Sequence, residues 1–388
     1  MKKIKVSQPL YYKKFQCTCD KCVYNCCRHN WQIRVDKETY NKYASLADDT
    51  GKEFLDSIKI LSEEPFIAVI IANKEGHCNF LDDKGFCKIQ LKLGHNYLCR
   101  TCMFHPRSIN YADGEFERYL ELSCEEAVRA VLFNDKPIMF EEANLKPDGN
   151  GNYIPNLMLK TEDYTTAANA GEIFTKLRKA SVSIVQNRQY SVRVRMLLLC
   201  ILIEQANQLF ANGLDSDVIK TVDEFMKAIR SGVYNSIANE MPDGLVADFS
   251  IVTDILTDMQ NKNDDRFNAI MEQAFKGHGL PFNKDELPAS FQEEYDNNYD
   301  RFFADKEYIF ENYLVNNIMM KGFPFNYGKD HVVIANFADL MVKFNIIEFL
   351  LVGLCKFHDT FDEWNIINCV SAFSRRYDHS EKGFLMMG

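Results

Sequence analysis

Cysteine is the residue type in this chain whose number and spacing point to chemistry. Ten of the thirteen cysteines lie within the first 124 residues. They form four groups: Cys17, Cys19, Cys22, Cys26 and Cys27; Cys78 and Cys87; Cys99 and Cys102; and Cys124. Thiolates two to four residues apart can converge on one metal ion or cluster, and distant cysteines then tie further loops to that site. In a reducing compartment this pattern indicates metal binding or redox chemistry rather than disulfides.

The spacing favours an iron–sulfur cluster over structural zinc. Structural zinc usually takes two short Cys-x-x-Cys-like hooks per ion. Here Cys78 and Cys87 are far apart for a hook, and Cys26 and Cys27 are adjacent, which fits neither a zinc finger nor a zinc ribbon. Irregular spacings contributed by several loops are commoner in [4Fe–4S] sites, with zinc as the alternative. The Cys-x3-Cys-x2-Cys spacing of radical S-adenosylmethionine enzymes is absent, because the first group runs in the opposite order.

The number of thiols exceeds what one cluster needs. A [4Fe–4S] cluster takes about four thiolates, so several N-terminal cysteines are left over. We expect either a reactive thiol in the stretch from Cys19 to Cys27 or a second metal site. Cys200, Cys355 and Cys369 lie in apolar helical contexts and are expected to be buried structural thiols.

Other chemistry-bearing residues give weaker signals. For the histidines within the cysteine motifs, a surface or structural role is the simpler interpretation. Arg188, Arg193 and Arg195, at the start of a long helix, are interpreted as solvent-facing. The only Gly-rich stretch, residues 148–152, lacks the strand-to-helix context of a Rossmann cofactor loop. The residues therefore identify no catalytic group and no cofactor-binding loop.

The cysteines sit in an N-terminal part that differs from the rest of the chain. Residues 1–133 are interpreted as a cysteine-rich, irregular metal-binding domain, and residues 157–388 as an α-helical domain. The stretch 134–156 between them contains three prolines and the turn signals Pro147-Asp148-Gly149 and Asn150-Gly151. We interpret it as a linker with room for a short hairpin, whose strands would be residues 138–140 and 153–154. The fold class is mainly α.

Hydrophobic periodicity places helices along the second part. The predicted helices span residues 161–187, 191–211, 222–229, 251–259, 302–320 and 335–357. The last is almost apolar all round, which indicates a central position.

Composition narrows the class of protein. The 388 residues are 46% hydrophobic and 26% charged, so the chain can build a sizeable core. Its net charge of −10 argues against a nucleic-acid backbone as the main partner. The longest apolar run, residues 196–203, is far shorter than a bilayer-spanning segment. The basic start has no apolar stretch behind it, so no secretory signal is expected and the predicted location is the cytoplasm.

Several stretches resemble a known family. They are CDKCVYNCCRHNWQIRVD at 19–36, CNFLDDKGFCKI at 78–89, LGHNYLCRTCMFHPR at 93–107 and LELSCEEAVRAVL at 120–132. The cysteine-rich part resembles zinc- or iron-chelating domains, and more closely the flagellin lysine-N-methylases. ENYLVNNIMMKGFPF at 311–325 resembles a helical signature of the same family. The family pattern of Thr-Cys followed by Pro-Arg is matched by Thr101-Cys102 and Pro106-Arg107, whereas Cys17, Cys99 and Glu125 depart from it.

The resemblance implies a function and a set of metal ligands. The family transfers methyl groups from S-adenosylmethionine to lysines of flagellin and requires an iron–sulfur cluster. The matched cysteines are the candidate ligands: Cys19, Cys22, Cys26, Cys27, Cys78, Cys87, Cys102 and Cys124. The alternative function is a non-catalytic zinc- or iron-chelating protein with a helical interaction domain. A third is a redox protein that uses Cys26 and Cys27.

Overall fold

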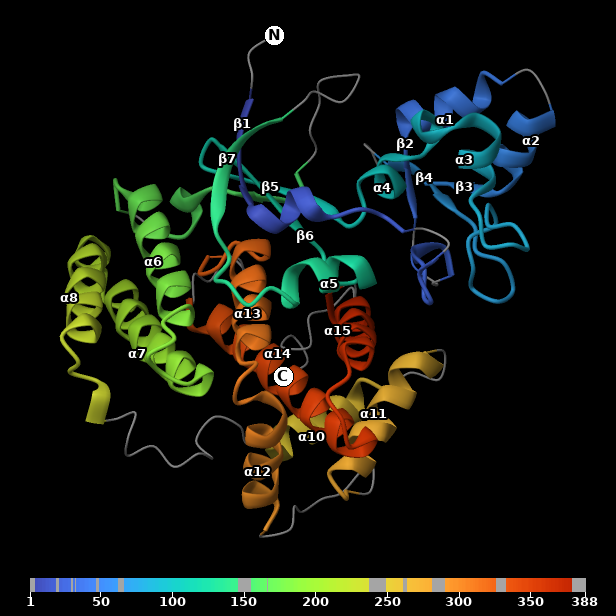
Figure 1. Ribbon diagram of the computed structural model, residues 1–388. Helices are drawn as coiled ribbons and strands as arrows, with labels where there is room; N and C mark the ends of the chain where they lie inside the picture. The colour runs from blue at the N-terminus through green and yellow to red at the C-terminus, as the bar shows by residue number, and fades with distance from the viewer. Residues whose placement is uncertain are drawn as a thin grey trace. The chain divides into compact units, whose positions relative to one another are not determined.

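The computed structural model describes most of the chain (Figure 1). It covers residues 4–18, 21–28, 31, 33–46, 49–61, 66–145, 155–165, 167–236, 249–260, 264–280, 290–325 and 333–378. The chain divides into two compact units. We call the smaller one the cysteine unit (Phe15–Ser108 and Cys124–Glu126) and the larger one the helical unit (Met1–Lys14, Ile109–Ser123 and Ala127–Gly388). The cysteine unit is thus an insertion between the first strand of the helical unit and the rest of that unit.

The cysteine unit is built on a small antiparallel sheet. Its strands β2 (Arg34–Asp36), β3 (Ile58–Ile60) and β4 (Phe66–Ile70) are arranged in the order β2-β4-β3. Short helices surround it: η3 (Cys26–Arg28), α1 (Lys37–Ala44), α2 (Asp49–Asp56), α3 (Lys88–Leu93), η4 (His95–Tyr97) and α4 (Arg100–Phe104). Tyr43, Phe54 and Phe80 stack edge to face, with ring centroids 5.3 and 5.0 Å apart, and form its apolar centre.

The helical unit contains a five-stranded mixed sheet in the order β7-β1-β6-β5-β8. Its strands are β1 (Ile4–Pro9), β5 (Arg107–Ala112), β6 (Glu115–Leu120), β7 (Phe140–Leu145) and β8 (Leu157–Leu159). Strand β1 pairs parallel with β6 and antiparallel with β7. Asp113 and Gly114, with φ values of 46° and 92°, join β5 to β6 in the two-residue turn that the right-handed twist of a hairpin favours.

Helices make up the rest of the unit. They are α5 (Glu125–Leu132), α6 (Ala170–Val185), α7 (Val192–Ala211), α8 (Val218–Arg230), α10 (Phe249–Asp258), α11 (Asp265–Gly277), α12 (Phe291–Phe303), α13 (Tyr308–Met320), α14 (Val333–His358) and α15 (Glu363–Asp378), with the short turns η1 (Leu10–Lys14), η5 (Thr161–Asp163) and η6 (Asp215–Asp217). Figure 1 shows α13 running from the sheet toward α12.

The predicted central helix is confirmed. Most of α14 is buried, and it contacts α7, α10, α11, α12, α13 and α15. Ser191 caps α7 through a hydrogen bond from the Val194 N–H to its side chain, at 3.4 Å. The predicted helix 302–320 is wrong as a single element, because α12 ends at Phe303 and α13 begins at Tyr308. The hydrophobic periodicity did not predict α11 or α15, and it predicted only the last residues of α12.

The N-terminal part is more regular than its sequence indicates. Its described residues carry six strands, β1 to β6, whereas cysteine spacing predicted an irregular structure. The alternation in these strands is short and is interrupted by cysteines and charges, so it gives little periodic signal. In the linker, residues 140–145 form β7 on β1, while residues 153–154, the second strand of the expected hairpin, lie outside the described residues. The boundaries at 133 and 156 stay a prediction about separately folding domains.

One helix of the described part, α7, is long and apolar enough to cross a membrane by length and composition alone. Its buried face carries Leu198, Leu199 and Leu202, and it packs against α6, α8 and α14. The core helix of a soluble protein meets the same criteria, so α7 is weak evidence for a membrane span.

Candidate functional site

The cysteine unit brings six thiols into one group, which we call the thiol cluster: Cys26, Cys27, Cys78, Cys87, Cys99 and Cys102. They come from three separate segments of the unit. The first is the turn η3, the second is the loop between β4 and α3, and the third is the first turn of α4.

Backbone hydrogen bonds hold the first two segments together. The Cys78 N–H donates to the Cys27 carbonyl at 2.8 Å, and the Trp31 indole N–H donates to the Cys26 carbonyl at the same distance. Between Cys78 and Cys87 the chain turns back on itself, since Asp82 accepts hydrogen bonds from the backbone of Lys84 and Phe86. The spacing that seemed too wide for a metal hook is therefore a closed turn.

The third segment is fixed by a buried carboxylate. Asp36 ends β2 and caps α1 by accepting from the Thr39 N–H at 2.9 Å, and it also accepts from the Arg100 N–H at 2.9 Å. Cys99 stands at the N-cap of α4, and Cys102 lies one turn along the helix. The two thiols are therefore neighbours on one helix face.

In the thiol cluster, the thiols are buried with too little positive charge nearby to stabilise their thiolate forms. A hydrogen bond with Cys26, together with burial, raises the pKa of Cys27, and burial raises the pKa of Cys78 to about 12. A hydrogen bond with Cys99, followed by burial, raises the pKa of Cys102. Each thiolate would also repel the others. A bound cation would offset that repulsion and stabilise the thiolates, so the donor set fits a thiolate-ligated metal.

The surroundings of the thiol cluster are apolar. Ile33, Val35, Ile89 and Leu98 are buried in the same core as Cys78 and Cys99. Such a shell excludes water and strengthens the interactions of charges inside it. Within the described residues, no three Cys, His, Asp or Glu side chains already stand at metal-binding positions.

The predicted ligands are thus distributed unevenly. Five of them, Cys26, Cys27, Cys78, Cys87 and Cys102, lie in the thiol cluster. Cys99, which the family pattern treated as an extra residue, lies there too. Cys19 lies outside the described residues. The assignment of ligands stays a prediction.

Cys22 belongs to a second, smaller set of residues. Its sulfur lies 3.2 Å from the Thr18 hydroxyl, and burial raises its pKa to about 11, with Glu125 and Cys17 nearby. The Glu125 carboxylate accepts hydrogen bonds from the Val23 and Tyr24 N–H groups at 3.2 and 2.8 Å. These hydrogen bonds connect residues 124–126, which include Cys124, to the loop that carries Cys22. Residues 124–126 therefore belong to the cysteine unit.

The helical unit contains a polar site that sequence reasoning missed. Lys343 on α14 is fully buried, and its ammonium lies 2.9 Å from Asp339 and 3.4 Å from Asp378. Lys321 reaches the same Asp378 oxygen at 3.0 Å, and the Tyr377 hydroxyl donates to Asp339 at 2.8 Å. The two carboxylates raise the pKa of Lys343 against the opposing effect of its burial, so it stays protonated.

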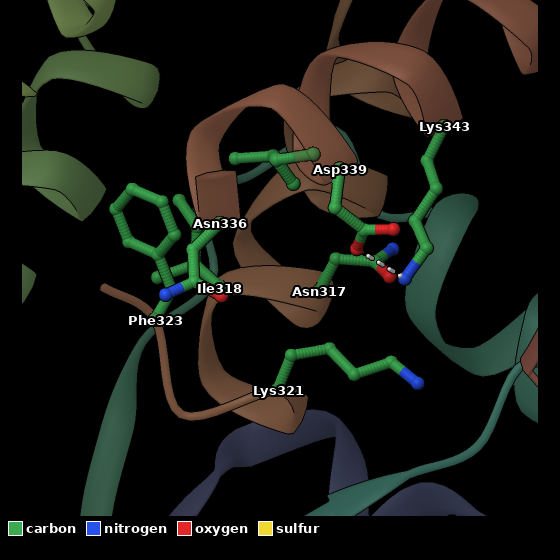
Figure 2. Close-up of a pocket in the computed structure, with 8 residues that line it drawn as sticks. Asn317, Ile318, Lys321, Phe323, Asn336, Asp339 and Lys343 are labelled. Atoms are coloured by element: carbon green, nitrogen blue, oxygen red, sulfur yellow. Dashed lines mark ion pairs between the residues drawn. The ribbon is translucent and has the colours of Figure 1, made fainter. Parts of the chain in front are cut away.

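Two cavities at this site have Lys321 in their linings. The first, of about 10 Å³, is the size of one water molecule. Figure 2 shows Asp339 and Lys343 pointing toward one another across it, with Asn317 beside them. The second cavity, of about 270 Å³, shares Lys321 with the first and reaches the sheet at Tyr119 and Leu157. Within the described structure, the side-chain oxygens of Asn317 and Asn336 accept no hydrogen bond.

The signal that could have identified this site lies in α13. An apolar helix that also contains Glu311, Asn312, Asn316 and Asn317 must bury them, since α13 is covered on all sides. Asn312 donates to the carbonyls of Leu132 and Asn134, and Asn316 donates to that of Leu120. These bonds attach α13 to the ends of β6 and α5.

The solvent-facing interpretation is wrong for Arg193 and Arg195, whereas Arg188 is exposed but still forms an ion pair. Arg195 is buried and pairs with Glu311 at 2.9 Å and Glu307 at 3.2 Å. Arg193 pairs with Asp296 at 2.7 Å, and Arg188 pairs with Glu311 at 2.8 Å. Local sequence does not show these pairs, because their acidic partners lie more than a hundred residues away.

Comparison with known proteins gives relatives for part of the chain. Over 142 residues, 36% of this chain, it is 30% identical to the lysine-N-methylase of Salmonella typhimurium (strain LT2) and 31% identical to the flagellar biosynthetic protein FliU of Salmonella muenchen. These matches cover 35% of the lysine-N-methylase and 83% of FliU, so the chain matches about a third of the full-length methylase. No solved structure matches the chain significantly.

A family model gives the wider match. The model of the FliB lysine N-methylase C-terminal domain matches residues 178–386. That range runs from the middle of α6 to beyond α15 and covers more than half of the 388 residues. The chain therefore belongs to the FliB lysine N-methylase family.

Proposed function

We propose that this protein is a lysine N-methyltransferase that acts on flagellin, uses S-adenosylmethionine as methyl donor and holds a [4Fe–4S] cluster on cysteines. Family membership over residues 178–386 is the observation that carries the methyltransferase assignment. The printed names of the relatives, a lysine-N-methylase and a flagellar biosynthetic protein, support a flagellar substrate. We propose the cytoplasm as its location, because free thiols persist there.

The thiol cluster supports the metal part of the proposal. A [4Fe–4S] cluster takes about four thiolates, and Cys78, Cys87, Cys99 and Cys102 could supply them from two segments, with Cys26 and Cys27 from a third. When bound, the cluster would supply redox chemistry and a cross-link between the loops. The residues of this chain bury the thiols, position them through Asp36 and the Cys78–Cys27 backbone bond, and keep water away.

Methyl transfer to lysine sets a chemical requirement. A protonated amine has no lone pair, so the acceptor lysine must lose a proton before its nitrogen attacks the sulfonium methyl group. The protein must therefore receive the ammonium, lower its pKa or accept its proton, and align it with the donor. Buried carboxylates that could receive an ammonium or its proton occur in both units, among them Asp36 in the cysteine unit and Asp339 in the helical unit.

The test combines a spectrum with an assay. Protein purified anaerobically should be brown, with a broad visible absorption that bleaches on reduction, and should contain iron and sulfide. With S-adenosylmethionine and purified flagellin it should add methyl groups that intact-mass analysis counts, and peptide mapping should place them on lysines. A colourless protein with stoichiometric zinc that leaves flagellin unmodified would instead support the non-catalytic chelator.

A further inference from the structure

The smaller cavity beside Lys343 lies between two helices of the helical unit. Its lining comes from the last turn of α13, the residues that follow it, and the first three turns of α14. Ile318, Phe323 and Leu340 supply the apolar part, and the other lining side chains are polar or charged (Figure 2). The volume of about 10 Å³ is that of one water-sized sphere, so the cavity has room for a single small ligand.

Hydrogen bonds determine which way the two lining asparagine amides face. Asn317 Nδ2 donates to the Tyr313 carbonyl at 2.9 Å, and Asn336 Nδ2 donates to the Pro324 carbonyl at 2.6 Å. Because a carbonyl only accepts, each amide nitrogen must point at its carbonyl and each amide oxygen must take the other side. Asn317 and Asn336 are 3% and 5% exposed, and neither oxygen accepts a hydrogen bond from the part of the chain that the structure describes. The cavity lining therefore contains two buried acceptors that need a donor.

Lys343 contributes a donor to the same cavity. Its side chain is 1% exposed, and its ammonium carries three hydrogens. Its ion-pair partners are Asp339 at 2.9 Å and Asp378 at 3.4 Å. One hydrogen directed at each carboxylate leaves a third, and the ammonium lines the cavity together with the two amides.

These groups together select one kind of ligand. It must donate two hydrogen bonds, to the amide oxygens, and accept one, from the ammonium. A cation would suit the amide oxygens, but the ammonium of Lys343 would repel it. An anion would suit the ammonium, but it would face two amide oxygens and the carboxylate of Asp339, which also lines the cavity. A water molecule is neutral, donates twice, accepts, and matches the volume.

We propose that this cavity binds one water molecule as a fixed part of the fold, which donates to Asn317 Oδ1 and Asn336 Oδ1 and accepts from Lys343 Nζ. Three hydrogen bonds are the usual number for a buried water. The water connects the last turn of α13 to α14 and gives the buried ammonium its third partner. The inference is independent of the proposed function, because it concerns how the helical unit holds these two helices together.

A high-resolution crystal structure of the full chain tests the site directly. It should show one density peak about 2.7–3.2 Å from each of the three atoms, Asn317 Oδ1, Asn336 Oδ1 and Lys343 Nζ. Crystals grown in rubidium chloride should give no anomalous signal at this position. A rubidium signal there, or the absence of a peak shared by the three atoms, would overturn the proposal.

Two substitutions at one position test the site in solution. Asn317→Leu removes an acceptor, whereas Asn317→Asp, the matched control, keeps it, and both lose the hydrogen bond to the Tyr313 carbonyl. Oxygen-17 relaxation dispersion counts long-lived internal waters. Asn317→Leu should hold one fewer than the wild type, and Asn317→Asp should hold the same number. Equal counts for Asn317→Leu and the wild type would contradict the proposal, and if Asn317→Leu does not fold, the wild-type crystal structure decides.

Discussion

At the scale of single residues, Cys99 changes how the thiol cluster is understood. It departs from the family pattern, yet it stands at the N-cap of α4, one turn from Cys102 and beside Cys78. A pair of thiols on one helical turn can bind the same metal without any change in the backbone. Cys26 and Cys27 share a hydrogen bond, as Cys99 and Cys102 do, but they are adjacent on a short turn. Because neighbouring side chains seldom both reach one metal, we expect a thiol in excess of the ligands in this pair.

Replacing single cysteines should show which of them bind the metal and which are structural. Cys78→Ala and Cys102→Ala should each lose iron and lower the unfolding midpoint of the cysteine unit, because metal binding there is coupled to folding. Cys200→Ala, on α7 in the helical unit, is the control and should retain the full iron content. Iron analysis with calorimetry measures both effects. Unchanged iron in both variants would exclude Cys78 and Cys102 as ligands.

His278 should make stability depend on pH. Its ring packs 4.3 Å from that of Phe349 and also touches Tyr295, its Nε2–H donates to the Phe349 carbonyl at 2.9 Å, and burial lowers its pKa to about 4, with Lys356 adding a smaller effect in the same direction. Because the folded-state pKa lies below the unfolded value, the stabilisation is complete above about pH 6.5 and is lost as the pH falls toward 4.

The loss should reach up to about 3 kcal/mol. His278→Gln can keep the hydrogen bond but cannot take up the proton, so its free energy of unfolding should fall less between pH 7 and pH 4. Urea unfolding at several pH values measures the difference. Parallel pH profiles for the two proteins would show that His278 does not contribute.

At the scale of elements, the crossing of α11 and α14 depends on two glycines. A Cβ atom on Gly353 would meet the Ala274 carbonyl oxygen at 2.5 Å and His278 Nε2 at 2.7 Å, and one on Gly277 would meet the Gly353 carbonyl at 1.9 Å. The two helices can therefore approach this closely only without side chains at the crossing. Since α14 is the central helix, the crossing positions α11 against the core of the whole unit.

Gly353→Ala should separate these helices. The expected cost is about 1–3 kcal/mol from overpacking, reduced by the better helix propensity of alanine. Lys356→Ala, an exposed change one turn further along α14, should alter stability by no more than about 0.5 kcal/mol. Thermal unfolding of the two variants beside the wild type gives the comparison. Equal midpoints would mean that the helices approach less closely than described.

At the scale of the whole molecule, the first strand belongs to the helical unit, although it precedes the cysteine unit in the sequence. β1 is an interior strand of the five-stranded sheet, between β7 and β6, although it precedes every cysteine in the sequence. Strand β1 is therefore part of the core of the helical unit, and the cysteine unit is an insertion that follows it in the sequence.

A single change in β1 should distinguish this topology from a chain of consecutive domains. Val6 is 1% exposed, so Val6→Asp buries an unpaired charge and should destabilise the helical unit by several kcal/mol. Lys5→Ala, exposed on the same strand, should cost less than about 1 kcal/mol. Calorimetry should show the loss in the transition of the helical unit, with iron content maintained. Loss of iron with an intact helical transition would place β1 with the cysteines instead.

The sequence by itself determined the features that depend on local spacing. Apolar residues at helical intervals predict α7, α8, α10 and α14, because an amphipathic or buried helix repeats its pattern within a few turns. The cysteine groups indicate thiol chemistry, because their number and spacing are visible in the chain itself.

Tertiary structure decided the features that join distant residues. Cys99 became a neighbour of Cys78, and Arg195 became the partner of Glu311. Lys321, Lys343 and Asp378 lie together beside a cavity that β6 and β8 help to line. β1 paired with a strand more than a hundred residues away. Such contacts follow from the packing of whole elements, and no local pattern of residue types records which elements will meet.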